Sequence, residues 1–184
     1  MITTLIKRIA CRLDKSKIPY MIIGGQAVLL YGTPRLTRAI DITLGVDTDQ
    51  WPLMDKICRD LGLRMLPDEP KGFAEQTKVL PAEDPGSRIW VDFIFSFTPY
   101  EAQAINRAKE VSMEGYPVKF ASCEDVIIHK MIAARAVDLE DVRHMLTKNR
   151  ERIDLDYLRR TLGEFSNLPE HQRILEDFED LLRR

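Results

Sequence analysis

Apolar residues along the chain follow two different spacings, one typical of helices and one typical of strands. In residues 2–16 they recur every three or four positions, which predicts an amphipathic helix. Residues 20–23 are apolar throughout and predict a short buried strand that ends at Gly24 and Gly25, before a helix over residues 26–31. Helical spacing returns after residue 122 and predicts helices near residues 123–134, 138–148, 155–165 and 169–183.

Two segments in the middle of the chain alternate between apolar and polar side chains, as strands with one buried face do. In residues 39–46 the even-numbered positions are apolar, and Asp41 lies on the opposite face. In residues 88–96 the apolar face takes the odd-numbered positions, and Asp92 lies opposite. A carboxylate in such a strand is costly to desolvate unless it is paired or binds a cation. One such aspartate is usually a structural hydrogen-bond acceptor, whereas two that converge on one sheet face indicate a metal site.

The remaining elements divide the chain into a mixed part and a helical part. We expect an α/β core over residues 1–121, with a small mixed sheet flanked by helices. Residues 122–184 are expected to form a C-terminal helical bundle packed on that core. The other elements predicted for the core are a helix from Thr48 to about residue 61, strands near residues 63–65 and 78–80, a helix over about 98–109, and a hairpin of residues 111–113 and 117–120.

Composition narrows the class of protein. The 184 residues include 27 Lys and Arg against 29 Asp and Glu, so a uniformly basic coat for nucleic acid is excluded and only a local basic patch is possible. No apolar run reaches the roughly 20 residues that cross a bilayer. Charged residues interrupt the N-terminal apolar stretch, unlike a signal peptide. Three scattered cysteines fit a reducing compartment, so we expect a cytoplasmic protein without membrane contact.

The strand that ends at Gly24 and Gly25 leads directly into a helix, an arrangement that can bind phosphate. Glycines allow the backbone to approach an anion closely, and the first N–H groups of a helix have no intrahelical partner. Strand–glycine–helix turns are common, however, and most of them only reverse the chain. The turn therefore indicates a phosphate site only in combination with residues further along the chain.

Gly24, Gly25, the phrase Arg35-Leu-Thr-Arg-Ala-Ile-Asp41-Ile and Asp92 together resemble the signature of the minimal nucleotidyltransferases in the polymerase-beta-like superfamily. In that signature Gly-Gly or Gly-Ser is followed, after a spacer, by Asp–hydrophobic–Asp or Glu, and a third Asp lies on a later strand. The phrasing is closest to AbiEii-type toxins and related bacterial toxin–antitoxin nucleotidyltransferases. Their downstream helix pattern matches Lys130, Arg135, Asp138 and Asp141.

The resemblance implies transfer of a nucleoside monophosphate from an NTP to an acceptor hydroxyl, with release of pyrophosphate. It implies Mg²⁺ or Mn²⁺ as the metal, held by Asp41 and Asp92. The acceptor would be the 3′ end of tRNA or another RNA, or a hydroxyl of a cognate toxin or antitoxin protein. The nucleotide-binding residues it implies are Gly24, Gly25, Arg35, Thr37, Arg38 and Lys130, with Arg35 and Arg38 also able to meet acceptor RNA, and Arg135, Asp138 and Asp141 in support.

Position 39 departs from the signature, because Ala39 stands where the first motif Asp is expected. Another register would use Asp41 and Thr43, at the cost of a longer spacer after Gly25. Either way the carboxylate triad that clamps two Mg²⁺ ions about 4 Å apart is incomplete. Losing one such contact lowers rates by roughly 10²–10³ or more, so we expect an inactive or strongly impaired enzyme. The alternative is a non-catalytic nucleotide-binding or interaction protein.

Several of these residues also have simpler interpretations. Lys130 could be a surface lysine whose stem covers apolar neighbours. Arg135 with Asp138 and Asp141 could be a solvated helix-surface network of small energetic value. The three histidines show no metal-ligand spacing with the cysteines, so a zinc site is not expected.

Overall fold

The computed structural model describes residues 1–34, 36–96 and 98–183, which form two compact units. Unit 1 contains residues 1–26 and 36–121, and unit 2 contains residues 27–34 and 122–183 of the described chain. The last residue of unit 1 is Ala121, and residues 27–34 cluster with the C-terminal helices. Two side chains of α7 (Ala136–Asn149) hold this segment by its backbone. The Asn149 side chain donates a hydrogen bond to the Tyr31 carbonyl at 2.7 Å, and the Lys148 side chain donates one to the Gly32 carbonyl at 3.1 Å.

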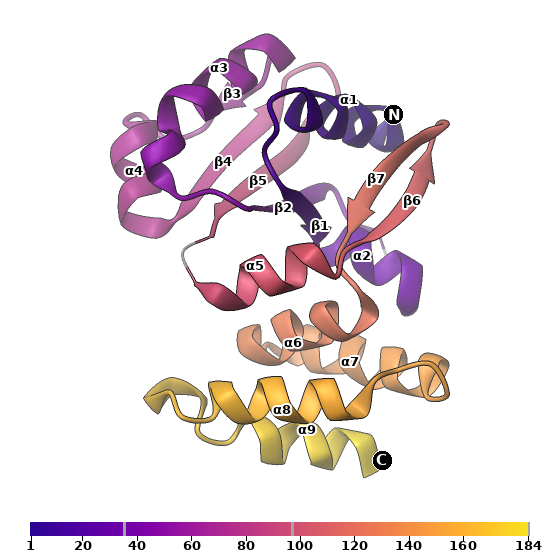
Figure 1. Ribbon diagram of the computed structural model, residues 1–184. Coiled ribbons are helices and arrows are strands. Elements are labelled where there is room, and N and C mark those ends of the chain that lie inside the picture. The colour runs from indigo at the N-terminus through magenta and orange to yellow at the C-terminus, as the bar shows by residue number, and fades with distance from the viewer. Residues whose placement is uncertain (35, 97, 184) are drawn as a thin grey trace. The chain divides into compact units, whose positions relative to one another are not determined.

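Unit 1 is built on a mixed sheet, which confirms the expected α/β class (Figure 1). In the described residues the sheet has seven strands in the order β3-β4-β5-β2-β1-β7-β6. At its centre β2 pairs in parallel with β5 and antiparallel with β1. The strands are β1 (Tyr20–Ile23), β2 (Ala39–Leu44), β3 (Arg64–Met65), β4 (Val79–Asp84), β5 (Ile89–Phe95), β6 (Lys109–Met113) and β7 (Tyr116–Phe120).

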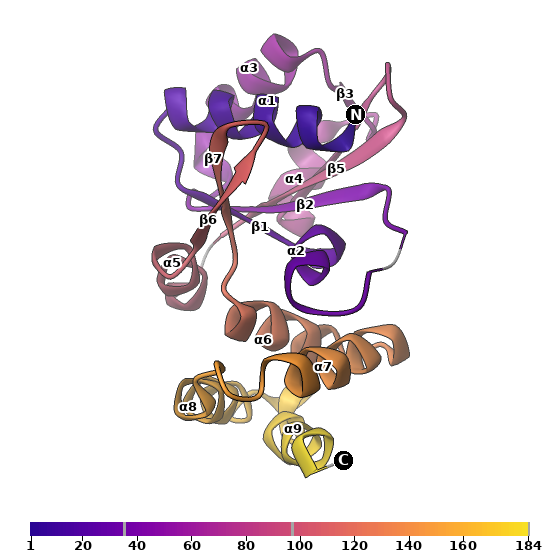
Figure 2. The ribbon, with the colours of Figure 1, turned by 90° about the vertical axis from the view of Figure 1, so that its right-hand side faces the viewer.

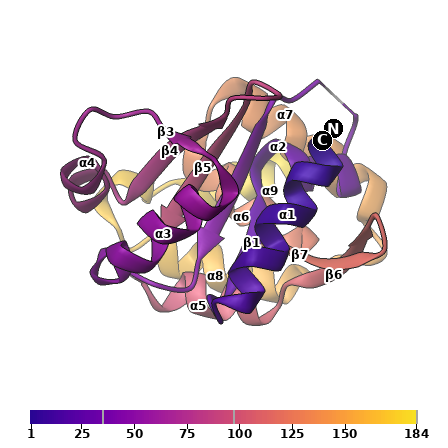
Figure 3. The same cartoon turned by 90° about the horizontal axis from the view of Figure 1, so that it is seen from above.

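Two amphipathic helices lie side by side on one face of this sheet, α1 (Ile2–Lys15) and α3 (Trp51–Leu61) (Figures 2 and 3). Their apolar side chains are buried against the sheet, as the helical spacing predicts. The helix α5 (Pro99–Asn106) lies on the opposite face (Figure 2). The alternation predicted for the central strands is confirmed, because Ile40 and Ile42 in β2 and Phe93 in β5 are almost fully buried.

The segment between residues 45 and 88 differs most from the sequence-based expectations. Asp47 caps a 3₁₀ turn over residues 48–50, so the helix expected from Thr48 begins as α3 only at Trp51. The helix α4 (Pro70–Thr77) was not predicted, because its polar composition gives little helical periodicity. The strand expected near 78–80 continues as β4 to Asp84, where a tight turn to β5 begins.

Unit 2 in the described chain is helical, and its helices begin and end close to the predicted positions. Ser122 caps the helix that begins at Cys123, since its side chain accepts a hydrogen bond from the Asp125 N–H at 3.1 Å. A 3₁₀ turn over residues 169–171 delays the last helix, which begins at Ile174 and not at residue 169. No described helix is long and apolar enough to cross a membrane. The helices are the end of α2 (Gly24–Tyr31), α6 (Cys123–Ala133), α7 (Ala136–Asn149), α8 (Leu155–Phe165) and α9 (Ile174–Arg183).

Candidate functional site

Asp41 and Asp92 lie side by side on one face of the sheet of unit 1. They are direct register partners in the parallel pair of β2 and β5, where neighbouring strands are about 4.8 Å apart. Both are only partly exposed. Burial, and then the nearby charge of Asp41, raise the pKa of Asp92 above the ordinary range of an aspartate. The structure therefore brings together the two carboxylates that the sequence analysis singled out.

The Gly24–Gly25 turn adjoins this pair on the β1 side. In the antiparallel pairing of β1 with β2, Ile23 is the partner of Asp41, so the turn begins one residue beyond the carboxylate. Gly24 has φ +62°, and a Cβ there would lie 1.9 Å from an oxygen of Asp41. A Cβ on Gly25 would lie 2.7 Å from the hydroxyl of Thr37. A side chain at position 24 would collide with Asp41, and one at position 25 would collide with Thr37, so both positions favour glycine. The sequence alone does not show these contacts.

Ala39 lies on the same strand face as Asp41, two residues earlier. An aspartate at this position would project from the same side of β2 as Asp41. In the described part of the chain, no three acidic, histidine or cysteine side chains are grouped so that they could hold a metal. Thr43 is fully buried, which disfavours the register that gives it the role of second motif residue. The geometry agrees with the register in which position 39 lacks a carboxylate.

Of the two arginines expected near the phosphates, Arg35 lies outside the described residues. Arg38 is exposed and stands just before β2, and its carbonyl accepts a hydrogen bond from the Trp90 N–H at 3.1 Å. A pocket of about 560 Å³ opens beside Arg38. It is lined by Leu36, Thr37, Arg38, Ala39, Glu83, Arg88 and Trp90.

Lys130, Asp138 and Asp141 form a buried ion cluster inside unit 2. The Lys130 ammonium lies 2.6 Å from an oxygen of Asp138 and 3.0 Å from an oxygen of Asp141, and the lysine side chain is 7% exposed. Burial by itself raises the pKa of Asp138, but hydrogen bonds from Arg135 and Lys130 outweigh it and lower the value. The interpretations of a surface lysine and of a solvated network are therefore wrong. Contact of Lys130 with a triphosphate stays a prediction.

Sequence reasoning missed the residues that line this pocket from β4 and the β4–β5 turn. Glu83 and Arg88 carry no motif, and only strand pairing brings them beside Ala39. The sequence could have predicted Trp90, because it lies on the same strand face as Asp92, opposite the apolar face.

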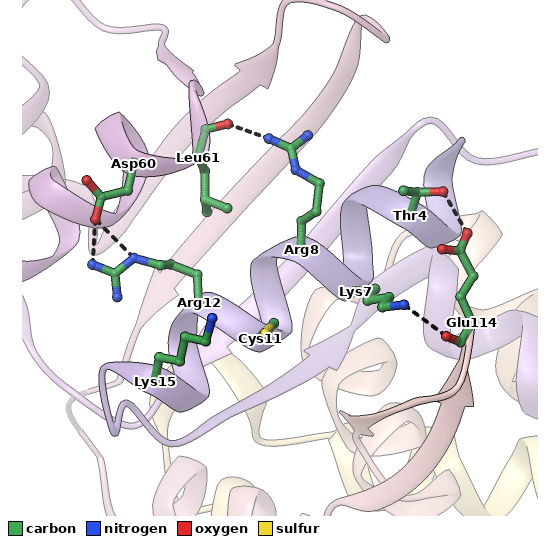
Figure 4. Close-up of a pocket in the computed structure, with 9 residues that line it drawn as sticks. All are labelled: Thr4, Lys7, Arg8, Cys11, Arg12, Lys15, Asp60, Leu61 and Glu114. Carbon is green, nitrogen blue, oxygen red and sulfur yellow. Dashed lines mark hydrogen bonds and ion pairs between the residues drawn. The ribbon is translucent and has the colours of Figure 1, made fainter.

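A second pocket, of about 350 Å³, lies along the exposed side of α1 (Figure 4). Several cationic side chains line it, but most of them already form a hydrogen bond or an ion pair with the protein. Arg12 lies 2.6 Å from Asp60, and Arg8 donates a hydrogen bond to the Leu61 carbonyl at 2.8 Å (Figure 4). Lys7 donates one to a carbonyl at 2.9 Å. None of the motif residues that the structure describes lines this pocket.

One family model matches the sequence, over residues 78–178, which is 101 of the 184 residues. Its description is "Nucleotidyl transferase of unknown function (DUF2204)". No curated protein matches. The match begins after the Gly24–Gly25 turn and includes Asp92 and the cluster around Lys130.

Several solved structures share the fold at low sequence identity. The crystal structure of ANT(2″)-Ia in complex with adenylyl-2″-tobramycin has a TM-score of 0.59 and 20% identity, covering 97% of each chain. JHP933 from Helicobacter pylori has a TM-score of 0.52 and 14% identity, over 98% of this chain and 90% of that one. The lincosamide antibiotic adenylyltransferase LnuA, bound to lincomycin, has a TM-score of 0.50 and 16% identity, over 72% and 89%. At such identities the likeness shows the fold alone.

Proposed function

Because the chain belongs to the DUF2204 family of nucleotidyl transferases, we propose that unit 1 binds an NTP and transfers its nucleoside monophosphate to an acceptor hydroxyl. One observation carries this proposal: Asp41 and Asp92 are register partners on one sheet face, directly beside the Gly24–Gly25 turn. A carboxylate pair next to a turn with close backbone access is the arrangement that phosphoryl transfer requires.

The residues of this site fit a divalent cation. Burial first, and the neighbouring charge of Asp41 second, raise the pKa of Asp92, and a cation held between the two carboxylates would offset both effects. Carboxylate oxygens are also preferred ligands of Mg²⁺ and Mn²⁺. Asp41 and Asp92 would hold the ion, which when bound neutralises phosphate charge and orients the substrate.

In the proposed reaction, residues of this chain bind the phosphates, hold the cation and accept a proton. The N–H groups of the turn at Gly24 and Gly25 bind phosphate oxygens, and Thr37 stands against Gly25 at the edge of the turn. The acceptor oxygen forms a bond to the α-phosphorus while the bond to the bridging oxygen breaks, and pyrophosphate leaves. Asp92, besides helping to hold the ion, would accept the proton of the acceptor hydroxyl.

The finer parts of the proposal rest on the sequence. Ala39 leaves one carboxylate missing, and we propose that it strongly lowers the rate. The phrase that ends at Asp41 supports a role in a bacterial toxin–antitoxin system, and the free cysteines support a cytoplasmic location. A second candidate, favoured by the same Ala39, is a nucleotide-binding protein without catalysis. We expect NTP binding in both cases.

Titration calorimetry with each NTP, with and without Mg²⁺, tests the proposal. The chain should bind at least one NTP, and Mg²⁺ should tighten binding through Asp41 and Asp92. In Asp92→Asn the NTP should still bind, because the backbone contacts remain, but the effect of Mg²⁺ should disappear. Asp55→Asn is the matched control, since Asp55 lies on α3 in an ion pair with Arg59, and it should behave as the unaltered chain.

The pH dependence of this titration can be derived from the direction of the Asp92 shift. A raised pKa means that the carboxyl gains its proton at a higher pH than an ordinary aspartate, and a protonated carboxyl does not ligate Mg²⁺. As the pH falls, the tightening of NTP binding by Mg²⁺ should therefore be lost at a higher pH than at a site whose aspartate has an ordinary pKa. Absence of NTP binding at millimolar concentration, or an unchanged Mg²⁺ effect in Asp92→Asn, would show that the site is assigned wrongly.

A further inference from the structure

We propose that Gln26 is a positioning residue of the candidate site, and that its side chain holds the Gly24–Gly25 turn against the start of β2. This inference rests on the proposed function and adds a residue that no motif includes. Gln26 is 7% exposed and follows the two glycines directly, as the third residue of α2. A buried polar side chain at such a place needs a hydrogen-bond partner, and the partner shows what the side chain does.

The pairing of β1 with β2 shows which hydrogen bond is missing at this end of the ladder. In an antiparallel pair, positions that exchange backbone hydrogen bonds alternate with positions that do not. The Gly45 N–H donates to the Pro19 carbonyl at 2.6 Å, which fixes the alternation. Continued beyond the end of β1, the ladder would pair the Ala39 carbonyl with the Gly25 N–H. The chain has already turned into α2 there, so this bond is absent from the described residues.

The Gln26 side chain supplies the donor that the ladder lacks. Its amide donates a hydrogen bond to the Ala39 carbonyl at 3.3 Å, and the Thr37 hydroxyl lies 3.5 Å from the same oxygen. Because the side chain takes this place, the ladder does not use the Gly25 N–H. Gly25 is also among the first four residues of α2, whose N–H groups have no intrahelical acceptor, so its N–H is left for a phosphate oxygen.

The start of β2 is thereby held from both sides. On the β5 side, the Trp90 N–H donates to the Arg38 carbonyl at 3.1 Å. On the turn side the fit is close, because a Cβ on Gly25 would lie 2.7 Å from the Thr37 hydroxyl. Loss of the Gln26 bond would let the turn and the strand move apart. Phosphates on the turn would then lie out of place relative to the two carboxylates, and binding would weaken.

Gln26→Met tests this role, because methionine has a similar volume and removes the donor. The affinity for NTP and the affinity for inorganic tripolyphosphate should fall by the same factor, about 3- to 10-fold, since the change acts on the phosphate turn and not on the nucleoside. Titration calorimetry below the unfolding temperature of each variant measures both affinities. Gln76→Met, on the exposed side of α4, is the matched control and should bind both ligands as the unaltered chain does.

Nuclear magnetic resonance of the unaltered chain gives a readout that does not depend on the folding of a variant. Tripolyphosphate should shift the backbone amide proton of Gly25, which binds it. The side-chain amide of Gln26 should stay protected from hydrogen exchange, because its bond to the Ala39 carbonyl is kept. In folded Gln26→Met the Gly25 shift should be smaller at the same tripolyphosphate concentration. A structural role alone would lower the unfolding temperature without changing the response of Gly25.

The outcomes distinguish this inference from the proposed function. If the unaltered chain binds neither NTP nor tripolyphosphate, the proposed function itself fails. If it binds them but Gly25 does not respond, or if Gln26→Met and Gln76→Met have equal affinities, this inference is wrong and the proposed function stands. Weaker binding of NTP together with unchanged binding of tripolyphosphate would also overturn the inference, because the effect would then lie at the nucleoside.

Discussion

Replacing Ala39 with aspartate is expected to raise metal-dependent nucleotide transfer by roughly 10²–10³-fold. The side chain at position 39 shares the strand face of Asp41, so the new carboxylate would project from the same side of β2. It would complete the set of three that the resemblance to nucleotidyltransferases implies. Ala39 is partly exposed beside a pocket of about 560 Å³, so two additional carboxylate oxygens have room.

Incorporation of labelled NTP into total RNA and total cell lysate measures this gain. Ala39→Asn is the matched control, because it adds a similar volume without the charge, and it should stay near the level of the unaltered chain. Combining Ala39→Asp with Asp92→Asn should abolish the gain. A labelled product that nuclease removes and protease does not would identify nucleic acid as the acceptor. Equal, negligible incorporation by Ala39→Asp and the unaltered chain would favour the non-catalytic alternative.

Replacing Lys130 with methionine is expected to destabilise the protein by about 3–5 kcal/mol. The ammonium lies within 3.0 Å of both Asp138 and Asp141, and each of these carboxylates is almost fully buried. Methionine fills a similar volume but leaves two neighbouring carboxylates without their shared cation. The cost comes from the loss of the cation that these two buried carboxylates share, more than from the value of the ion pairs themselves, although Asp138 keeps its hydrogen bonds to Arg135.

Urea unfolding curves measure this effect. Arg135→Met should cost much less, because Arg135 is 71% exposed and Asp138 keeps its bond to Lys130. Adding Asp138→Asn and Asp141→Asn to Lys130→Met should recover part of the loss by removing the stranded charges. A cost below about 1 kcal/mol for Lys130→Met would contradict the cluster as described. Titrating the folded variant with NTP tests separately whether this lysine contacts phosphate.

The sequence predicts the candidate site well where local periodicity determines it. Alternation in β2 and β5 places Asp41 and Asp92 on polar strand faces, and the strand–glycine–helix pattern predicts the turn at Gly24. The alternation of apolar and polar residues does not predict how two strands that are far apart in the chain pair with each other. The direct pairing of Asp41 with Asp92 appears only in the parallel ladder of β2 and β5, which β3, α4 and β4 separate in sequence.

The features that sequence reasoning missed depend on contacts between distant segments. Charged side chains are mostly exposed, so burial of Lys130 with two aspartates from the following helix could not be inferred from their spacing. The pocket depends on Glu83, which reaches Ala39 across two strand pairings. The requirement for glycine at position 25 likewise depends on Thr37, which stands on a later segment of the chain.

The central claim is that this is a nucleotidyl transfer site from which one carboxylate is missing. The most direct measurement is the number of Mn²⁺ ions bound together with an unreactive NTP analogue, read from the electron paramagnetic resonance signal of free Mn²⁺. The unaltered chain should hold one ion with the nucleotide, and Ala39→Asp should hold two, as a complete two-metal site does. Equal numbers of bound ions in the two proteins would contradict the claim that position 39 is the missing metal ligand.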